Sequence, residues 1–291
     1  MRKDAPAAFR RLLAEGFIMP LVRHKPRPPL NRFIETLWLW EGCPRPHPRE
    51  RILPDGSMQI IVNLIDDRIP LYDRSTGERR GGTRGVLLCG PRSEYSVIDT
   101  ATQVAVFGFH FKPGGMLPFL RMPLDELHDQ EVGLDCLWGR VADELRDRVL
   151  SAPNDAAKFE EAENYLLSRA VRDFARHPAV GYALGELCTA PSQPLMRIAE
   201  GIGISSRRFI ELFRHEVGMP PKVFARVRRF QSAVQTIGGR APTIEWAHVA
   251  ADCGYYDQAH FIHDFRAFSG LTPSAYLASR TEHLNHVPFD P

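Results

Sequence analysis

A helix near the C-terminus carries side chains that are suited to reading the edges of DNA bases. Its three phenylalanines, Phe261, Phe265 and Phe268, recur at helical spacing and therefore share one buried face. The residues left on a separate face are Gln258, Ala259, His260 and His263. Glutamine pairs with adenine through two hydrogen bonds, and a small alanine can touch a thymine methyl group. The pattern predicts a major-groove reading helix, and an ordinary solvated helix face is the alternative.

A second helix of the same design lies upstream. Ser205 is its expected N-cap, and Gly218 begins the segment that ends it. Phe209, Leu212 and Phe213 predict its buried face. The outward positions are Ser206, Arg207, Ile210, Glu211 and Arg214. The chain therefore contains two candidate reading helices.

Short helices and turns must position both reading helices. In the second unit a helix should start after Pro242, with Thr243 as its cap, and should stop at Gly254. Asp257 then caps the reading helix, and Gly270 ends it. A helix, a turn containing glycine and a second helix form the helix-turn-helix motif.

The segment between the two units predicts one continuous helix. Residues Val223–Ile237 contain neither Gly nor Pro. Such a rod holds two reading helices apart, so that they can enter major grooves roughly 34–36 Å apart along one face of the duplex.

The C-terminal third resembles the DNA-binding domain of AraC/XylS-type bacterial transcription regulators, over roughly residues 192–280. The residues that carry the resemblance include Ala199-Glu200, Ser205-Ser206-Arg207-Arg208, Leu212-Phe213, Val217-Gly218, Pro221-Lys222, Arg228-Arg229-Phe230, Gly254-Tyr255-Tyr256-Asp257-Gln258, His260-Phe261, Asp264-Phe265 and Gly270-Leu271-Thr272-Pro273. The resemblance implies base reading by Arg207, Ile210, Glu211 and Arg214 in the first unit and by Gln258, Ala259, His260 and His263 in the second. Glu211 departs from the basic or amide residue common at its position.

The same resemblance implies the partners of the chain. They are double-stranded DNA, RNA polymerase and a second copy of the chain in a homodimer. A small-molecule effector is implied as well, although the resemblance does not identify it.

The basic excess of the chain lies in the C-terminal third. Residues 192–282 contain eleven Lys/Arg and eight Asp/Glu, whereas residues 1–191 contain twenty-six of each. Basic side chains on a DNA-binding domain contact phosphates. The expected phosphate contacts are Ser206, Arg208, Arg226, Arg228 and Arg229.

The composition of the chain excludes several classes of protein. No apolar run approaches the length of a membrane span, so we expect no membrane partner. The five cysteines are scattered without metal-ligand spacing, which favours a reducing cytoplasm over a disulfide framework or a zinc site. Within the first twenty residues we expect a short amphipathic helix rather than a signal peptide.

The N-terminal part predicts several short strands. The expected strands are 33–40, 58–65, 86–89, 95–99 and 104–111, and residues 66–85 form a loop or a weak hairpin. The pattern WLWEG, ILPDGSMQIIVNL, GFHFKPGG resembles the cupin-like domain of one AraC-type subgroup. The resemblance implies a β-barrel that acts as a sensor or dimerisation module.

Helices should follow this barrel. Residues 134–150 and 158–174 have helical periodicity, and 180–188 predicts a further short helix. We therefore expect an α+β protein with a cupin-like barrel at 1–130, a helical connector at 131–190 and an all-α double helix-turn-helix domain at 191–285. The tail from Glu282 to Pro291 should be frayed or loosely packed.

Candidate chemistry in the barrel is limited to a ligand pocket. Trp38, Trp40, Arg51 and Asp55 could line it, because aromatic walls with a few polar groups are typical of such sites. The alternative is that the tryptophans are core residues and that Asp55 belongs only to its turn. His110 should face solvent if its neighbours Phe109 and Phe111 face inward.

No catalytic residues, metal ligands or cofactor are expected. A metal enzyme on a cupin-like barrel would need histidines close together, and no His-x-His pair occurs. The predicted function is a sequence-specific DNA-binding transcription regulator, with a small ligand in the barrel as a candidate effector. The alternative is a cupin-type small-molecule binder or metal enzyme with an accessory helical domain.

Overall fold

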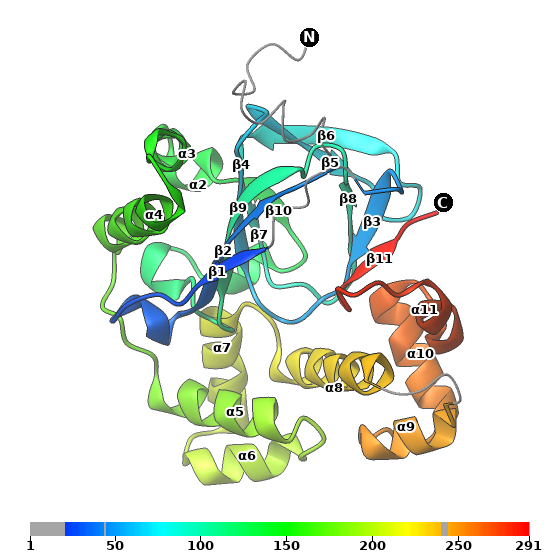
Figure 1. Ribbon diagram of the computed structural model, residues 1–291. Helices are drawn as coiled ribbons and strands as arrows, with labels where there is room; N and C mark the ends of the chain where they lie inside the picture. The colour runs from blue at the N-terminus through cyan, green and yellow to red at the C-terminus, as the bar shows by residue number, and fades with distance from the viewer. Residues whose placement is uncertain (1–20, 44, 240–243, 291) are drawn as a thin grey trace.

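The computed structural model describes residues 21–43, 45–239 and 244–290. It contains a β-rich N-terminal domain above a layer of helices (Figure 1), which confirms the α+β prediction. The expected N-terminal helix within residues 1–20 and the predicted cap at Thr243 lie outside the described residues.

The N-terminal domain is built from antiparallel sheets. The largest has the strand order β1-β2-β9-β4-β7-β10, the second has β11-β3-β8, and β5 pairs with β6. Among the described residues these three ladders do not join into one closed barrel. The strands are β1 (Val22–His24), β2 (Ile34–Glu41), β3 (Arg49–Ile52), β4 (Gln59–Asn63), β5 (Arg68–Tyr72), β6 (Arg79–Arg84), β7 (Val86–Cys89), β8 (Ser96–Asp99), β9 (Ala105–Phe111), β10 (Glu131–Gly133) and β11 (His286–Pro288).

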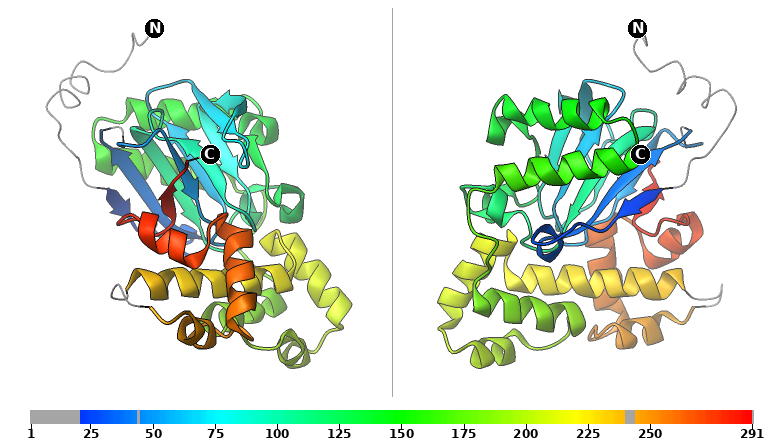
Figure 2. Two further views of the ribbon diagram at one scale, coloured as in Figure 1. Left: turned by 90° about the vertical axis from the view of Figure 1, so that its right-hand side faces the viewer. Right: turned by 60° about the vertical axis from the view of Figure 1, so that its left-hand side comes forward.

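Helices cover one face of the six-stranded sheet. Side chains alternate between the two faces of a strand. In β9 this places Phe107, Phe109 and Phe111 in a buried core with residues of α3 and α4, which cross that face of the sheet in Figure 2. The helical elements of this domain are η1 (Leu30–Arg32), η2 (Leu117–Phe119), η3 (Leu124–Leu127), α2 (Asp135–Trp138), α3 (Val141–Ser151) and α4 (Asp155–Arg169).

The predicted helices of the connector need two corrections. The expected helix at 134–150 is broken into α2 and α3, because Gly139 adopts a positive φ of 67° between them. The helix expected at 158–174 ends at Arg169, and Phe174 instead packs against the rings of Phe33 and Phe119.

The C-terminal helices form two small cores on one shared helix. α8 runs unbroken through Pro221–Gly238, which confirms the predicted rod. Phe224 near its start belongs to the core of the first unit, and Phe230 near its middle belongs to the core of the second. The remaining helices are α5 (Pro178–Thr189), α6 (Leu195–Ile202), α7 (Ser206–Val217), α9 (Trp246–Asp252), α10 (Gln258–Ser269) and α11 (Pro273–Ser279).

The C-terminal tail does not fray, contrary to the sequence prediction. After α11 the chain returns to the N-terminal domain and adds β11 to the edge of β3, next to which it lies in Figure 1. Val287 and Phe289 are buried there. The apolar side chains of the tail find a surface on the other domain, which a reading of the tail by itself does not reveal.

Candidate nucleic-acid interface and cavity

The second reading helix, α10, has the predicted caps. The side chain of Asp257 accepts a hydrogen bond from the backbone N–H of His260 at 2.7 Å. Gly270 ends the helix with a φ of 72°, in the left-handed region. Phe261, Phe265 and Phe268 are buried, as their spacing predicts. These contacts determine which face of α10 remains free to contact a partner.

The predicted reading residues of α10 lie on the surface. Gln258, Ala259 and His263 are exposed. His260 is half-buried, and its ring packs edge-on against Tyr255 with 5.4 Å between the ring centroids. Three of the four side chains therefore face solvent, and the fourth lies beside them with part of its surface covered.

A buried ion pair holds α10 against α8. Asp264 is 2% exposed and accepts hydrogen bonds from Arg226 at 2.7 and 3.3 Å. This hydrogen-bonded pair raises the pKa of Arg226, against the opposing effect of its burial. The guanidinium also lies over the ring of Phe268. Arg226, predicted as a phosphate contact, is thus engaged within the domain.

The first reading helix, α7, has the same framework. Ser205 accepts a hydrogen bond from the N–H of Arg208, and Gly218 ends the helix with a φ of 90°. Phe209 and Phe213 are buried. The outward residues are exposed, and they are Ser206, Arg207, Arg208, Ile210, Glu211 and Arg214.

Carboxylates already contact the arginines of α7. Nε of Arg207 lies 3.0 Å from Oε1 of Glu211, and Arg208 lies 3.8 Å from the same carboxylate. Arg214 donates to Asp125 of η3 in the N-terminal domain at 2.9 Å. The first reading face is therefore partly neutralised, and one of its residues is tied to the other domain.

The remaining arginines of α8 are half-buried. Arg229 donates to the carbonyl of Gly254 at 3.1 Å and lies over the ring of Tyr255. Arg228 has a buried Nε atom without a hydrogen-bond partner among the described residues. Their predicted contacts with phosphate remain predictions, and at least Arg229 also supports the turn that precedes α10.

Sequence reasoning missed two residues near the reading faces. Tyr256, in the turn before α10, is 92% exposed. Asp125 lies about ninety residues from its partner Arg214, and no local pattern connects the two. The signal for Tyr256 was its place beside the cap Asp257, whereas only the folded structure reveals Asp125.

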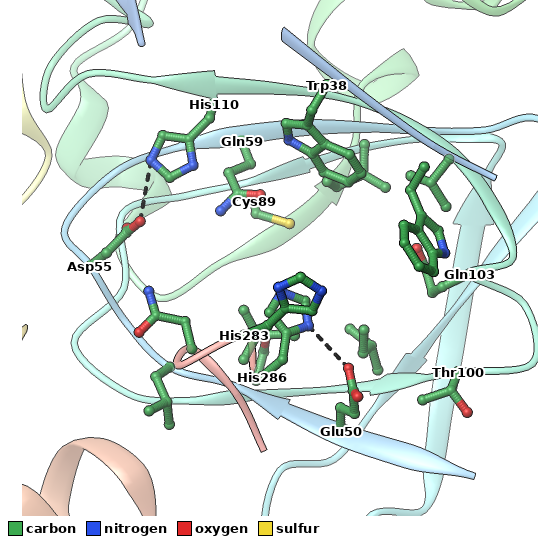
Figure 3. A pocket seen from close by; sticks show the side chains of 18 of the residues that line it. Trp38, Glu50, Asp55, Gln59, Cys89, Thr100, Gln103, His110, His283 and His286 are labelled. Carbon is green, nitrogen blue, oxygen red and sulfur yellow. Dashed lines mark hydrogen bonds and ion pairs between the residues drawn. The ribbon is translucent and has the colours of Figure 1, made fainter. Parts of the chain in front are cut away.

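A cavity of about 460 Å³ lies between the six-stranded sheet and the smaller sheets (Figure 3). Trp38, Trp40 and Asp55 line it, as predicted. Arg51 does not line the cavity, which corrects the prediction. Side chains alternate along β3, so its neighbours Glu50 and Ile52 face the cavity while Arg51 points away and donates to the carbonyl of Pro288.

His110 lines this cavity and does not simply face solvent, contrary to the sequence prediction. It lies 3.2 Å from Asp55 (Figure 3). Burial by itself would raise the pKa of Asp55 and lower that of His110. The hydrogen bond and opposite charges outweigh burial, and they lower the pKa of Asp55 and raise that of His110. The pair is therefore held in its charged form.

Glu50 organises a second charged cluster on the cavity wall. Its carboxylate lies 2.7 Å from His47, 3.0 Å from His286 and 3.2 Å from Arg45. Burial acts to raise the pKa of Glu50, and its partners, with His286 foremost, lower it. Because His286 belongs to β11, the C-terminal tail contributes directly to the cavity.

Comparison with known families matches two separate parts of the chain. Residues 198–279 match a family described as a helix-turn-helix domain, and residues 22–133 match a domain of unknown function, DUF6597. No curated protein matches the chain.

Solved structures also align with this chain, and the three described next have TM-scores below 0.5. The DNA-binding domain of AdpA, a global transcriptional factor solved with target DNA, is 24% identical over 35% of this chain and 90% of its own, with a TM-score of 0.31. ToxT from Vibrio cholerae is 10% identical over 83% of this chain and 96% of its own, with a TM-score of 0.43. A ToxT structure with a bound unsaturated fatty acid gives a TM-score of 0.41 at 10% identity, over 79% of this chain and 91% of its own.

No helix among the described residues is both long and apolar enough to cross a membrane. The helical region has the two helix-turn-helix units that the sequence predicts, each with its reading helix capped and exposed. Residues 198–279 of this chain form a helix-turn-helix domain, joined to an N-terminal domain that matches DUF6597 over residues 22–133.

Proposed function

We propose that this protein is a transcription regulator that binds specific sequences of double-stranded DNA. The observation that carries the proposal is the helix-turn-helix match at residues 198–279, together with two exposed polar faces on α7 and α10. α8 contributes to the cores of both units, so the two faces are held by one rigid element.

The two helices read bases through different chemistry. On α10, Gln258 offers the donor and acceptor pair that matches adenine, and Ala259 offers an apolar contact for thymine. On α7, Arg207 and Arg214 carry guanidinium groups, which can pair with guanine through two hydrogen bonds, and Glu211 can accept from cytosine N4. Ile210, at 42% exposure, supplies an apolar contact between them.

Phosphate contacts set the register of the domain on the duplex. Ser206 and Arg208 are exposed in the first turn of α7, where backbone N–H groups also point outward. Arg228 of α8 is a further phosphate contact, whereas Arg226 and Arg229 act mainly by holding the second unit together. Any contact that they make with phosphate is secondary to that role.

The N-terminal domain controls the binding of DNA by the helix-turn-helix units. The cavity between the sheets holds a small effector, and η3 contacts α7 directly through Asp125 and Arg214. A homodimer and a contact with RNA polymerase complete the proposed mechanism. Both follow from the resemblance to AraC/XylS-type regulators.

Selection of preferred sites from random duplex DNA, with the full chain, tests the proposal. We expect enrichment of a motif with two blocks about one helical turn apart. A single block would mean that only one unit reads bases. Absence of enrichment, repeated with a cell extract as a source of effector, would contradict the proposal.

Salt dependence separates DNA binding from a protein-docking use of the same surface. Binding through roughly six phosphates should lose about three orders of magnitude between 50 and 200 mM salt. A flat dependence would instead favour docking to a protein.

The second candidate function is a cupin-type small-molecule binder or enzyme, and the cavity is the observation that favours it. Elemental analysis of the purified full chain separates the two candidates. A stoichiometric transition metal would favour the enzyme.

A further inference from the structure

The cavity is built by both domains. Most of its lining comes from strands of the N-terminal domain, but Gln235 of α8 and the segment Glu282–His286 also line it. Figure 3 shows His283 and His286 reaching into the space from the tail, opposite Trp38 and Gln59. Any occupant therefore lies against residues that follow directly from the second helix-turn-helix unit.

The lining segment of the tail is tied to three elements at once. The backbone N–H of Leu53 donates to the carbonyl of Asn285 at 2.9 Å, next to the β11–β3 ladder. Gln231 of α8 donates to the side chain of Asn285 at 3.1 Å and to the carbonyl of Pro54 at 2.7 Å. Tyr276 of α11 donates to the carbonyl of Leu284. A shift of this segment would therefore change its hydrogen bonds to α8 and α11.

The charged groups of the cavity wall already have partners. Glu50 is surrounded by His47, His286 and Arg45, and Asp55 pairs with His110. Glu131 lies 3.0 Å from Arg92. Arg23, which also lines the cavity, is exposed to solvent. Apart from the solvent-exposed Arg23 and Glu282, where an ion pair contributes little, the described residues of the wall offer no free counter-charge. A charged occupant deeper in the cavity would have to break one of these pairs, which is costly in a half-buried site.

Groups that can bind an uncharged molecule remain available. The side chains of Gln59 and Gln103 line the cavity and make no hydrogen bond to the described residues. Trp38 lies across Gly108, its partner on β9, and any side chain at position 108 would collide with the indole. The cavity thus offers flat aromatic surface beside two amides that can each donate and accept.

We infer that the cavity is an interdomain effector site for an uncharged, ring-bearing molecule with hydrogen-bonding groups, and that its occupant changes DNA affinity through the segment Glu282–His286. The inference rests on the proposed function. An occupant that contacts this segment stabilises one position of the tail, and hence one position of α8 and α11, over another.

Three probes of the same shape and different charge test the ligand class. Benzamide is neutral, benzoate is an anion and benzamidine is a cation. Titration calorimetry of each into the full chain should give binding about tenfold tighter for benzamide than for either ion. Equal or tighter binding of an ion, or no binding of any probe, would overturn the inference.

Glutamine variants test the location of the probe. Gln59→Leu should weaken benzamide binding about fivefold, which corresponds to the loss of one hydrogen bond. Gln130→Leu is the matched control, because Gln130 is exposed and does not line the cavity, and it should leave the affinity for benzamide unchanged. Equal effects of the two variants would place the probe elsewhere.

The ratio of DNA affinities with and without saturating benzamide tests the coupling. We expect a change of about fivefold in the native chain and a ratio near one in His283→Ala, which removes a ring of the tail from the cavity. Leu284→Ala is a second variant for the same purpose. A change in basal affinity cancels in this ratio, so the variants need not match the native chain.

The possible failures are distinguishable. If DNA binds specifically and benzamide leaves its affinity unchanged, the interdomain coupling is wrong while the proposed function stands. If no duplex is bound with or without benzamide, the proposed function itself is wrong.

Discussion

The two helix-turn-helix units share one framework and differ in what surrounds their reading faces. Each reading helix begins at a side-chain cap, ends at a left-handed glycine and buries phenylalanines against α8. On α7, however, Glu211 and Asp125 already hold the arginines that should read bases. On α10, Gln258 and His263 are exposed and uncharged groups predominate.

The units are also attached to the N-terminal domain in different ways. α7 contacts η3, and the ion pair between Arg214 and Asp125 links the two elements. The side chain of Arg214 is 51% exposed. The second unit is attached through β11 and the buried carboxylate of Glu50. This difference teaches that the two units are joined to the N-terminal domain by different chemistry: α7 through a half-exposed ion pair, and the second unit through a paired strand and a buried carboxylate.

The largest expected effect tests the shared framework. Phe265→Ala in the second unit and Phe213→Ala in the first should each lower the free energy of unfolding by about 3–5 kcal/mol, because both rings are fully buried. Urea unfolding followed by circular dichroism measures this loss. Tyr256→Ala is the control, since that ring is exposed. A much smaller loss in one unit would mean that the frameworks are not equivalent.

The attachment of the second unit should depend on pH. Glu50→Gln should cost about 3 kcal/mol at pH 7, because a buried carboxylate that contacts Arg45, His47 and His286 loses its charge. The folded pKa of Glu50 lies below its ordinary value of 4.5. Its contribution is therefore fully present above about pH 4.5 and is lost as the pH falls through the lowered pKa.

Urea unfolding of the native chain and of Glu50→Gln at several pH values checks this prediction. The difference in stability between the two proteins should shrink toward zero at acid pH. A gap that stayed constant with pH would show that the carboxylate charge does not hold the tail.

The reading face of α10 should show base specificity. Gln258→Ala should cost about 1–3 kcal/mol at one base pair and relax the preference there. Binding of a set of duplexes with single substitutions measures the effect. Arg208→Ala on α7 is the contrasting variant, because loss of a phosphate contact should weaken all duplexes alike. An unchanged sequence preference in Gln258→Ala would contradict the assignment of this face.

The smallest expected effect concerns the contact between α7 and the N-terminal domain. Asp125→Asn should release Arg214 and raise DNA affinity by no more than about fivefold, because a half-exposed ion pair is worth less than about 1 kcal/mol. Fluorescence anisotropy with the selected duplex measures this change. Weaker DNA binding in Asp125→Asn would instead mean that the ion pair positions Arg214 for reading.

Local patterns were enough to predict the two reading helices of the C-terminal domain and the long helix between them. Apolar spacing with caps at Ser205 and Asp257 located both reading helices, and the absence of breakers located α8. Such signals act within one or two helical turns, so they are visible in the sequence. The strand at 86–89 was likewise predicted at its observed bounds, although four short strands, β1, β3, β10 and β11, were missed.

The alternation of side chains along the strands was predicted, but what each face of the sheet contacts was not. His110 points away from the phenylalanine core, as expected, yet its face of the sheet borders a cavity rather than solvent. A strand pattern shows only that two faces differ. The same limit applies to Arg51, whose neighbours on β3 line the cavity in its place.

The sequence by itself determined where this chain forms helices that can read DNA, because capping, apolar spacing and turn residues act locally. Only the tertiary structure decided which charges meet. Arg226 finds Asp264, Arg214 finds Asp125, and His286 of the tail finds Glu50, across separations of 38, 89 and 236 residues. Partners so distant leave no local pattern, and they are chosen by how the helices and the two domains pack.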